Sequence, residues 1–471
     1  MANYVSARVP YVRTEILDLS TTPIASVAKE IERKVKTLRF ESSPIIGITT
    51  TTASYQAALK VARSFKDLDR SCTVVFGGHH ASSDAEMVLR MHPDCVDVVI
   101  IGEGEKALAI MLEKFPDLSQ VPGAAFLNGV KFCANPVPPF LDQMELDNLQ
   151  LSFNGNGLIG TPGKFGHVTY VSARGCPLQC AFCSVANEKM RAKNVCQVVK
   201  DICELAEMGF SQIAIEDNFF AHSPSRTEEL CLGLASIRRE SRIQFSWDCQ
   251  TRLESMARPG VVPLFAAAGC KAVYIGVESL NSDHLLYMKK TRNPKRYVDL
   301  LLTTVAPSLF DSSVDCYINL QFGIPGEKLD HERNTINLLS ELGSMALSKG
   351  KTVTIFPQLH VVYPGTAHFA CGILEGRFPR DVFETFTAWE AEQDPVLFWL
   401  GEHFAHGTGG LPEGILISEK LKKGIYEVDV GAVCRISGVL KTLDRISGIS
   451  VFPYGQYLVK CNSMPFNQGE S

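Results

Sequence analysis

The sequence predicts an α/β protein in which an N-terminal, doubly wound (Rossmann-like) parallel sheet precedes a partial (β/α)6 barrel and a small C-terminal α+β cap. Two observations predict this class. Short apolar runs alternate with amphipathic helical segments from residue 14 to about 135, and the alternation resumes for six units after residue 166. A passage rich in proline, asparagine and glycine separates the two. We therefore expect a sheet domain at 1–140, a linker at 141–165, a barrel at 166–370 and a cap at 371–471.

In the first domain, apolar and β-branched runs predict the strands. They are expected at 14–20, 45–52, 72–80, 96–105 and 123–129, with helices at 26–40, 54–68, 83–92 and 106–115. In the second domain, strands are expected at 167–174, 212–220, 243–251, 272–279, 315–325 and 353–362. Ligands of such domains bind where parallel strands end at their carboxyl edge, so the residues after each strand are the candidates for function.

Composition excludes several classes. The chain has 471 residues, 45% of them hydrophobic, and a formal net charge of -5 without a basic block, so nucleic acid is not an expected partner. The first 20 residues lack the apolar core of a secretory signal, and no apolar run reaches the roughly 20 residues of a membrane span. Fifteen cysteines, an odd number, fit a reducing compartment. We expect a soluble, cytoplasmic protein without a membrane partner.

Three cysteines follow the first barrel strand in "VSARGCPLQCAFCSV", at 171–185. Cys176, Cys180 and Cys183 have the spacing C-x3-C-x2-C, which alone is compatible with a metal site, a disulfide fragment or chance. Soft thiolates favour zinc, copper(I) or iron–sulfur clusters. Three ligands leave a tetrahedral zinc site incomplete, whereas on a four-iron cluster they leave one iron open for another ligand.

This motif, with Phe182 before its last cysteine, resembles that of the radical S-adenosylmethionine (SAM) enzymes, and the resemblance extends over 166–370. It implies that Cys176, Cys180 and Cys183 bind a [4Fe-4S] cluster and that Phe182 belongs to the cofactor site. In this family the open iron binds SAM, and one electron cleaves SAM to a 5′-deoxyadenosyl radical that abstracts hydrogen from the substrate. An auxiliary cluster is not expected, since no C-x2-C pair occurs after residue 300.

The resemblance also assigns cofactor contacts to the later strand ends. Glu216, Asp217 and Asn218 lie at the end of the second strand, Gln250 and Arg252 at the end of the third, and Gly276 and Glu278 at the end of the fourth. Glu216 and Asp217 are the candidate catalytic acid or base. The glycine-rich turn after the fifth strand supplies Gly323, Pro325, Gly326 and Glu327. Alternatively, 216–218 form only a capped turn, and Arg252 is a surface side chain.

The domain order resembles the subgroup of these enzymes that carries an N-terminal cobalamin (B12)-binding-type domain. This implies that cobalamin lies at the carboxyl edge of the first sheet, near Gly77, Gly78, His79, Gly102 and Glu103. The D-x-H-x-x-G motif, whose histidine coordinates cobalt, is absent, because neither His79 nor His80 stands two residues after an aspartate. His79 would then be a turn residue, and cobalt would be held without such a histidine.

The function that this resemblance implies is cobalamin-dependent methylation of an unactivated carbon in a small biosynthetic intermediate. The alternative is a cobalamin-independent dehydration, deoxygenation or rearrangement of a sugar or polyol, and a non-catalytic iron–sulfur sensor is a third hypothesis. A flavodoxin- or ferredoxin-type protein is the implied electron donor. His403 and His406, in a Gly-rich segment, are either substrate contacts or exposed loop residues.

Overall fold

A computed structural model of the chain describes residues 1–17, 19, 22, 26–38, 43–52, 54–149, 167–240, 244–322, 324, 326–360, 363–374, 439, 442–443 and 445–451. These form two compact units, one from 1–149 with 363–374 and one from 167–360 with 439–451. Most of the cap predicted at 371–471 and the candidates Gly323, Pro325, His403 and His406 lie outside the described residues.

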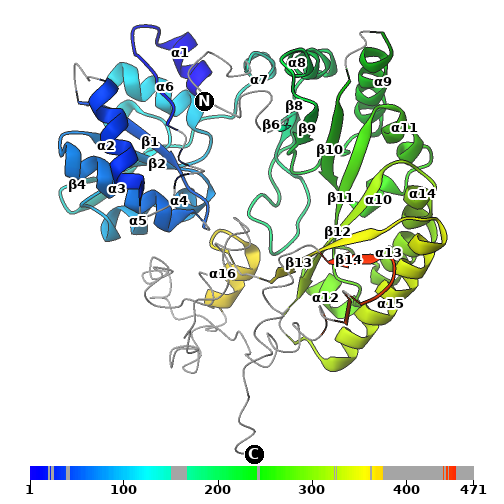
Figure 1. The fold of residues 1–471 in the computed structure, drawn as a ribbon. Helices are drawn as coiled ribbons and strands as arrows, with labels where there is room; N and C mark the ends of the chain where they lie inside the picture. Colours follow the sequence, from blue (N-terminus) through cyan, green and yellow to red (C-terminus); the bar gives the residue numbers. More distant parts are fainter. Residues whose placement is uncertain are drawn as a thin grey trace, which may run out of the picture. The chain divides into compact units, whose positions relative to one another are not determined.

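The first unit contains a five-stranded sheet in the order β1-β2-β3-β4-β5 (Figure 1). The strands are β1 (Ile45–Thr49), β2 (Thr73–Gly77), β3 (Val98–Ile100), β4 (Ala124–Asn128) and β5 (Lys131–Ala134). The helices are α1 (Ala2–Arg8), α2 (Val27–Leu38), α3 (Tyr55–Leu68), α4 (His79–Ser83), α5 (Ala85–Met91), α6 (Gly104–Lys114) and α7 (Gln143–Asp147), with a 3-10 turn at Leu118–Gln120. Helix α16 (Ala367–Leu374) belongs to the same unit.

Two hydrophobic cores cover the two faces of this sheet, as a doubly wound fold requires. Val74 and Phe76 of β2 pack into the core that α2, α3 and α5 share, while Val75 between them packs into the core beneath α6. This alternation follows from the period of two along a strand. The predicted doubly wound class is thus confirmed, although β4 and β5 run antiparallel, as a hairpin. The described residues of the strand expected at 14–20 form no strand.

The second unit contains a sheet in the order β14-β13-β12-β11-β10-β9-β6. Its strands are β6 (His167–Tyr170), β9 (Gln212–Ile215), β10 (Ser246–Thr251), β11 (Cys270–Glu278), β12 (Asp315–Phe322), β13 (Val353–Leu359) and β14 (Ile449–Val451), all paired in parallel. Six of them are the strands that the sequence predicts for a partial barrel. The seventh, β14, comes from the segment predicted as a cap. The boundary between barrel and cap at residue 370, like the other domain limits, stays a prediction.

Helices cover one face of this curved sheet (Figure 1). They are α8 (Val195–Glu207), α9 (Pro224–Glu240), α10 (Leu253–Met256), α11 (Val261–Ala267), α12 (Ser282–Tyr287), α13 (Pro294–Leu300), the π-helix η3 (Leu301–Val305), α14 (Ala306–Phe310) and α15 (Leu329–Ser348). Strand residues on that face, such as Val273, Ile318 and Ile355, are fully buried. The alternate residues are polar or aromatic, as at Gln250, Tyr274 and Tyr317 in one register row. One face therefore makes the core and the other is left for a ligand.

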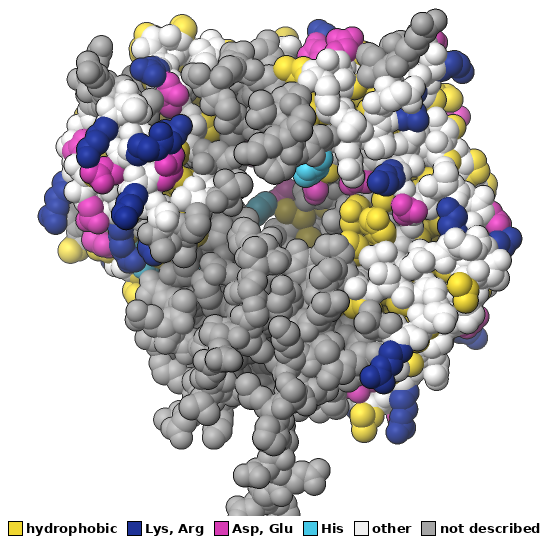
Figure 2. Space-filling view, in the orientation of Figure 1, with side chains coloured by type: hydrophobic (Ala, Val, Ile, Leu, Met, Phe, Trp, Pro, Cys, Tyr) yellow, Lys and Arg dark blue, Asp and Glu magenta, His cyan; other side chains and the backbone are white. Residues whose placement is uncertain are grey.

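The surface carries both charge signs. Lys/Arg and Asp/Glu side chains are interspersed over the described residues on the face that Figure 2 shows, in keeping with 46 basic and 51 acidic residues in the chain. Within the described part, no helix has the length and apolar content that a membrane span requires.

Candidate functional site

The three cysteines lie on a loop that is closed at its base. It leaves β6, passes through β7 (Ala173–Arg174) and returns through β8 (Arg191–Ala192), which pairs antiparallel with β7. Inside the loop, the Glu188 amide donates to the Cys176 carbonyl (2.9 Å) and the Asn187 amide to the Leu178 carbonyl (2.7 Å). A ladder of two residues a side thus closes a long loop at the carboxyl edge of the barrel strands.

The three thiols of the loop lie near one another and are shielded from solvent: Cys176 and Cys180 are buried and Cys183 is half-buried. Burial raises the pKa of Cys176, and it raises that of Cys183 to about 11. The neighbouring thiols add to both increases, which indicates mutual proximity. However, the three sulfur atoms are not among the described ligand groups whose atoms all lie within 4.8 Å. Thiolates on one zinc ion, each about 2.3 Å from it, would lie about 3.8 Å apart. Three thiols that share one loop without forming such a group are compatible with thiolates that bind separate irons of a cluster.

Arg252 lies beside the cysteine loop. It follows β10, and its Nη1 donates to Cys180 Sγ over 3.5 Å. Its Nε and Nη2 donate to the Glu254 carboxylate (3.1 and 2.9 Å), and Nη2 also donates to the Lys290 carbonyl (2.7 Å). The sequence predicts Arg252 as a SAM contact, but in this structure its donors are directed at protein atoms.

A buried polar chain begins at Glu278, the last residue of β11. Its backbone is left-handed (φ 71°), and its carboxylate pairs with Lys290 Nζ (3.3 Å) and accepts from Gln321 Nε2 (2.8 Å). Gln321 Oε1 therefore faces His360 Nδ1 at 2.7 Å, which makes Nδ1 the protonated nitrogen of that ring. A Cβ at Gly276 would lie 2.5 Å from Glu278 Oε1, so a larger residue there would displace the Glu278 carboxylate.

The row of polar side chains from Glu278 through Gln321 to His360 ends beside the cysteine motif. The His360 ring lies 6.4 Å from that of Phe182 and 5.9 Å from that of Tyr287, and the Ala181 amide donates to the Met288 carbonyl (2.9 Å). The structure therefore places Phe182 and Arg252 at the cysteine loop and connects Glu278 to them through other polar side chains. It adds Lys290, Gln321 and His360, which the sequence does not single out.

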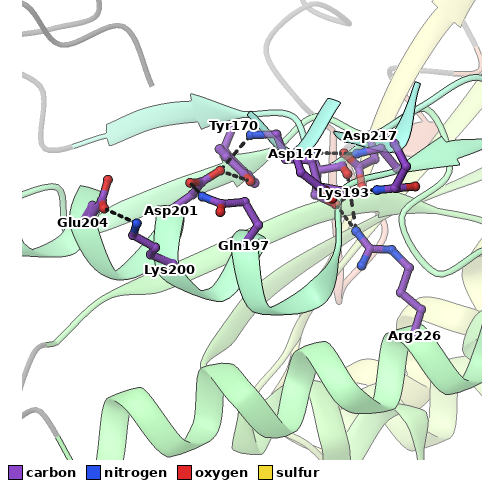
Figure 3. A network of polar contacts seen from close by, with 12 residues as sticks. Asp147, Tyr170, Lys193, Gln197, Lys200, Asp201, Glu204, Asp217 and Arg226 are labelled. Atoms are coloured by element: carbon purple, nitrogen blue, oxygen red, sulfur yellow. Dashed lines mark hydrogen bonds and ion pairs between the residues drawn. The ribbon is translucent and has the colours of Figure 1, made fainter. Parts of the chain in front are cut away.

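Asp217 lies apart from the open face. Its Oδ1 accepts from the Ser172 and Ala173 amides (2.6 and 2.8 Å) and its Oδ2 from Ser172 Oγ (2.5 Å), while Arg226 donates to the Ser172 carbonyl (3.3 Å; Figure 3). Burial raises the pKa of Asp217 to about 6, and these hydrogen bonds oppose the increase. The carboxylate thus fixes the segment that leads into the cysteine loop.

A second buried polar group supports the same segment. Asp201 on α8 accepts hydrogen bonds from Tyr170 Oη (2.7 Å), Lys193 Nζ (2.8 Å) and Gln197 Nε2 (2.6 Å; Figure 3). Lys193 follows β8 and its amide donates to the Ser172 carbonyl (3.0 Å). The group therefore ties β6 and both ends of the loop to α8.

Glu216 and Gln250 face a cavity of about 290 Å³ on the polar side of the sheet. Its lining residues are His167, Gln212, Ala214, Ile215, Glu216, Asp248, Cys249, Gln250 and Tyr274. Burial raises the pKa of Glu216, and the Asp248 carboxylate raises it further. Asn218 is exposed beyond this cavity. The cavity offers carboxylates and amide groups to a polar ligand.

In the first unit, three strand ends form one edge because β1, β2 and β3 are parallel. Gly77, Gly78 and His79 follow β2, and Gly102 and Glu103 follow β3. Thr50, which the sequence does not single out, donates through Oγ1 to the Gly77 carbonyl (2.8 Å). Gly78 has φ 91°, and a Cβ there would lie 2.4 Å from the Thr50 carbonyl oxygen. The loops pack closely and leave their backbone at the edge for a ligand.

The two histidines of that edge differ. His79 is exposed, whereas His80 is buried against the Tyr55 ring (4.2 Å) and bonded through Nδ1 to Thr52 Oγ1 (3.0 Å). His79 is therefore the histidine at the ligand edge.

One described group of metal-ligand type lies elsewhere, at His92, Asp94 and Cys95. The Arg63 guanidinium contacts His92 Nδ1 (3.3 Å) and Asp94 Oδ2 (3.5 Å). The charge of Asp94 is therefore already paired with Arg63.

Comparisons with known proteins agree with both units. A family model described as "B12 binding domain" matches residues 2–112, and one described as "Radical SAM superfamily" matches 170–339. The chain is 26% identical over 339 residues to a protein of Pyrococcus horikoshii named an uncharacterized methyltransferase, covering 69% of this chain and 68% of that one. It is 25% identical over 249 residues to the hopanoid C-3 methylase of Methylococcus capsulatus, covering 50% and 46%.

A solved structure has the same fold. The radical S-adenosylmethionine methyltransferase TsrM from Kitasatospora setae, determined with cobalamin and a [4Fe-4S] cluster, matches with a TM-score of 0.64 at 16% identity, over 80% of this chain and 74% of that one.

Proposed function

Because this chain is a radical SAM enzyme with an N-terminal B12-binding-type domain, we propose that it methylates an unactivated carbon of a small biosynthetic intermediate. The proposed cofactors are a [4Fe-4S] cluster, SAM and cobalamin. When bound, the cluster supplies the electron that cleaves SAM, and cobalamin supplies the methyl group. The observation that carries the proposal is the pair of family matches, one for each unit, with Cys176, Cys180 and Cys183 on one loop of the second unit. The methyltransferase names of the relatives support it.

In this proposal the protein residues have separate tasks. Cys176, Cys180 and Cys183 hold the cluster, and the Phe182 ring shields it on the side of His360. Glu216 and Gln250 hold the polar parts of SAM at the cavity between β9 and β10, and Asn218 contacts SAM from the exposed turn after β9. The raised pKa of Glu216 also allows it to hold or move a proton there.

Cobalamin is proposed to lie at the carboxyl edge of β1, β2 and β3. The backbone of Gly77, Gly78 and Gly102 would contact it, with His79 and Glu103 beside it. The close packing of Gly78 on Thr50 supports this, because it keeps the edge free of side-chain bulk.

Anaerobic reconstitution with iron, sulfide and hydroxocobalamin tests the proposal. After desalting, the chain should hold about four irons and stoichiometric cobalt, and with a reductant and SAM it should form 5′-deoxyadenosine. Iron without cobalt would overturn the methylation and favour the cobalamin-independent dehydration or rearrangement. A flavodoxin or ferredoxin is the proposed reductant.

A cysteine variant tests the cluster ligands. Replacing Cys176, Cys180 and Cys183 with alanine should abolish iron binding and SAM cleavage. The control replaces Cys196 and Cys203 on α8, which are not deeply buried, and should keep both. Full iron content in the triple variant would contradict the assignment.

A further inference from the structure

The Arg252 guanidinium is fixed against a cysteine of the loop. Its side chain is only 13% exposed and is held by Glu254 in a two-point ion pair, with donor–acceptor distances of 3.1 and 2.9 Å. This geometry leaves Nη1 directed at Cys180 Sγ, 3.5 Å away. Arginine remains charged in proteins, and its planar donors keep a fixed direction once two of them are bound.

The same arginine is tied to the segment that supports the loop from the other side. Nη2 donates to the Lys290 carbonyl (2.7 Å), and two residues earlier the Met288 carbonyl accepts from the Ala181 amide (2.9 Å). Lys290 is itself fixed by its buried ion pair with Glu278. The distance from Arg252 to Cys180 is therefore set by contacts at both ends.

We infer that Arg252 is a positioning and tuning residue, which donates a hydrogen bond to the Cys180 thiolate and raises the reduction potential of the cluster. The inference rests on the proposed cluster at Cys176, Cys180 and Cys183, and it replaces the role in SAM binding that the sequence suggests for Arg252. Reduction adds negative charge to a cluster already bound to thiolates. A hydrogen bond and a positive charge at a ligand sulfur stabilise the reduced state more than the oxidised state.

Redox titration of the reconstituted full chain without SAM, followed by electron paramagnetic resonance, tests the inference. Arg252→Gln should keep the iron content of the wild type and shift the midpoint potential to a more negative value. Arg252→Lys should give a smaller shift, because it keeps the charge but not the two-point pair. Glu254→Gln loosens the arginine but also removes a neighbouring negative charge, which opposes the effect, so its shift should be smaller than that of Arg252→Gln.

Arg258→Gln is the matched control. Arg252 directly precedes helix α10 and Arg258 follows it. Arg258 donates to the Ala221 and Ser255 carbonyls rather than to the loop, so the potential of this variant should stay at the wild-type value.

Three results would overturn the inference. An unchanged potential in Arg252→Gln together with weaker SAM binding would make Arg252 a SAM contact. A shift of equal size in Arg258→Gln would make the effect non-specific. Iron loss from both Arg252→Gln and Glu254→Gln would reduce Arg252 to a support of the loop. Failure of the proposed cluster is a separate result, since the wild-type chain would then bind no iron, and iron without cobalt would overturn the methylation while leaving this test intact.

Discussion

Glu216 and Asp217 are neighbours with opposite surroundings. Successive side chains of an extended segment point to opposite faces, so Glu216 faces the polar cavity while Asp217 turns into the protein. Asp217 there accepts three hydrogen bonds from Ser172 and Ala173. From the sequence both carboxylates are equal candidates for acid–base chemistry, but this geometry favours a positioning role for Asp217.

Asp217→Ala should lower the free energy of unfolding by about 1–3 kcal/mol, because it leaves the buried Ser172 and Ala173 amides without an acceptor. The base of the cysteine loop should loosen, and reconstituted iron should fall. Asp217→Asn should keep most of the stability and iron, since its amide oxygen can still accept from both amides. Urea unfolding and iron analysis check these outcomes.

Glu216→Gln is the control for the two Asp217 variants. It should leave the unfolding free energy near the wild-type value and lower SAM affinity. If Asp217→Asn held its full iron content but no longer cleaved SAM, the Asp217 carboxylate would take part in the reaction, as the sequence suggests.

At the scale of elements, the cysteine loop depends on one glycine. Gly175 has φ 83°, and a Cβ at this position would lie 2.4 Å from the Lys189 carbonyl oxygen. The turn therefore combines a left-handed backbone with close contact between the outgoing and returning chains. This contact sets the first cysteine, Cys176, at the correct end of the β7–β8 ladder.

Gly175→Ala should destabilise the chain by more than the backbone strain alone and should reduce the iron content. Gly260→Ala is the matched variant, because Gly260 has φ 79° but no atom within 4 Å of the added Cβ. It should cost only about 1–2 kcal/mol and keep the iron. If urea unfolding gave the same loss of unfolding free energy for both variants, the contact with Lys189 would not contribute to stability.

The Asp201 group makes a second prediction at this scale. Asp201→Ala should destabilise the chain by about 3–5 kcal/mol, because Lys193 would keep a buried charge without its partner. The double variant Lys193→Met, Asp201→Leu should recover most of this loss, since no charge is then buried. Thermal unfolding of the three proteins checks the order. A double variant no more stable than Asp201→Ala would mean that the Tyr170 hydrogen bond dominates.

The regular elements could be predicted from periodicity, and the contacts that complete the site could not. Six barrel strands and four helices of the first unit follow the alternation in the sequence. The β4–β5 hairpin has a local signal, the two-residue Gly129-Val130 turn between apolar runs, with φ 60° at the glycine. By contrast, Thr50, Lys290 and His360 reach their partners through tertiary packing, and no local pattern marks them.

For the molecule as a whole, buried histidines make stability depend on pH. Burial lowers the pKa of both His80 and His92 to about 4, so both are neutral in the folded chain near pH 7. In the unfolded chain they take up protons below their ordinary pKa of about 6.5. The unfolded state therefore binds more protons, and the unfolding free energy should fall between about pH 6.5 and 4, by up to roughly 1.4 kcal/mol per pH unit for each histidine.

Asp217 acts in the opposite direction over part of this range. Its pKa is raised by burial to about 6, so the folded state takes up that proton first as the pH falls, and this favours folding. The net slope of the wild type consequently mixes opposing contributions. Comparing a histidine variant with the wild type separates the histidine contribution from that of Asp217, because both proteins retain Asp217.

His80→Gln should remove the His80 contribution alone. It should lower the unfolding free energy at pH 7.5, because the packing on Tyr55 is lost. The difference in unfolding free energy from wild type should narrow steadily toward pH 5, because only the wild type is destabilised at low pH by a buried histidine that stays unprotonated in the folded state. Ser83→Ala, at the end of the same helix, removes a hydrogen bond but no titratable group and should lower the unfolding free energy equally at every pH. Urea unfolding without added cofactors measures both, and a constant difference for His80→Gln would mean that His80 accepts protons in the folded chain as readily as in the unfolded one.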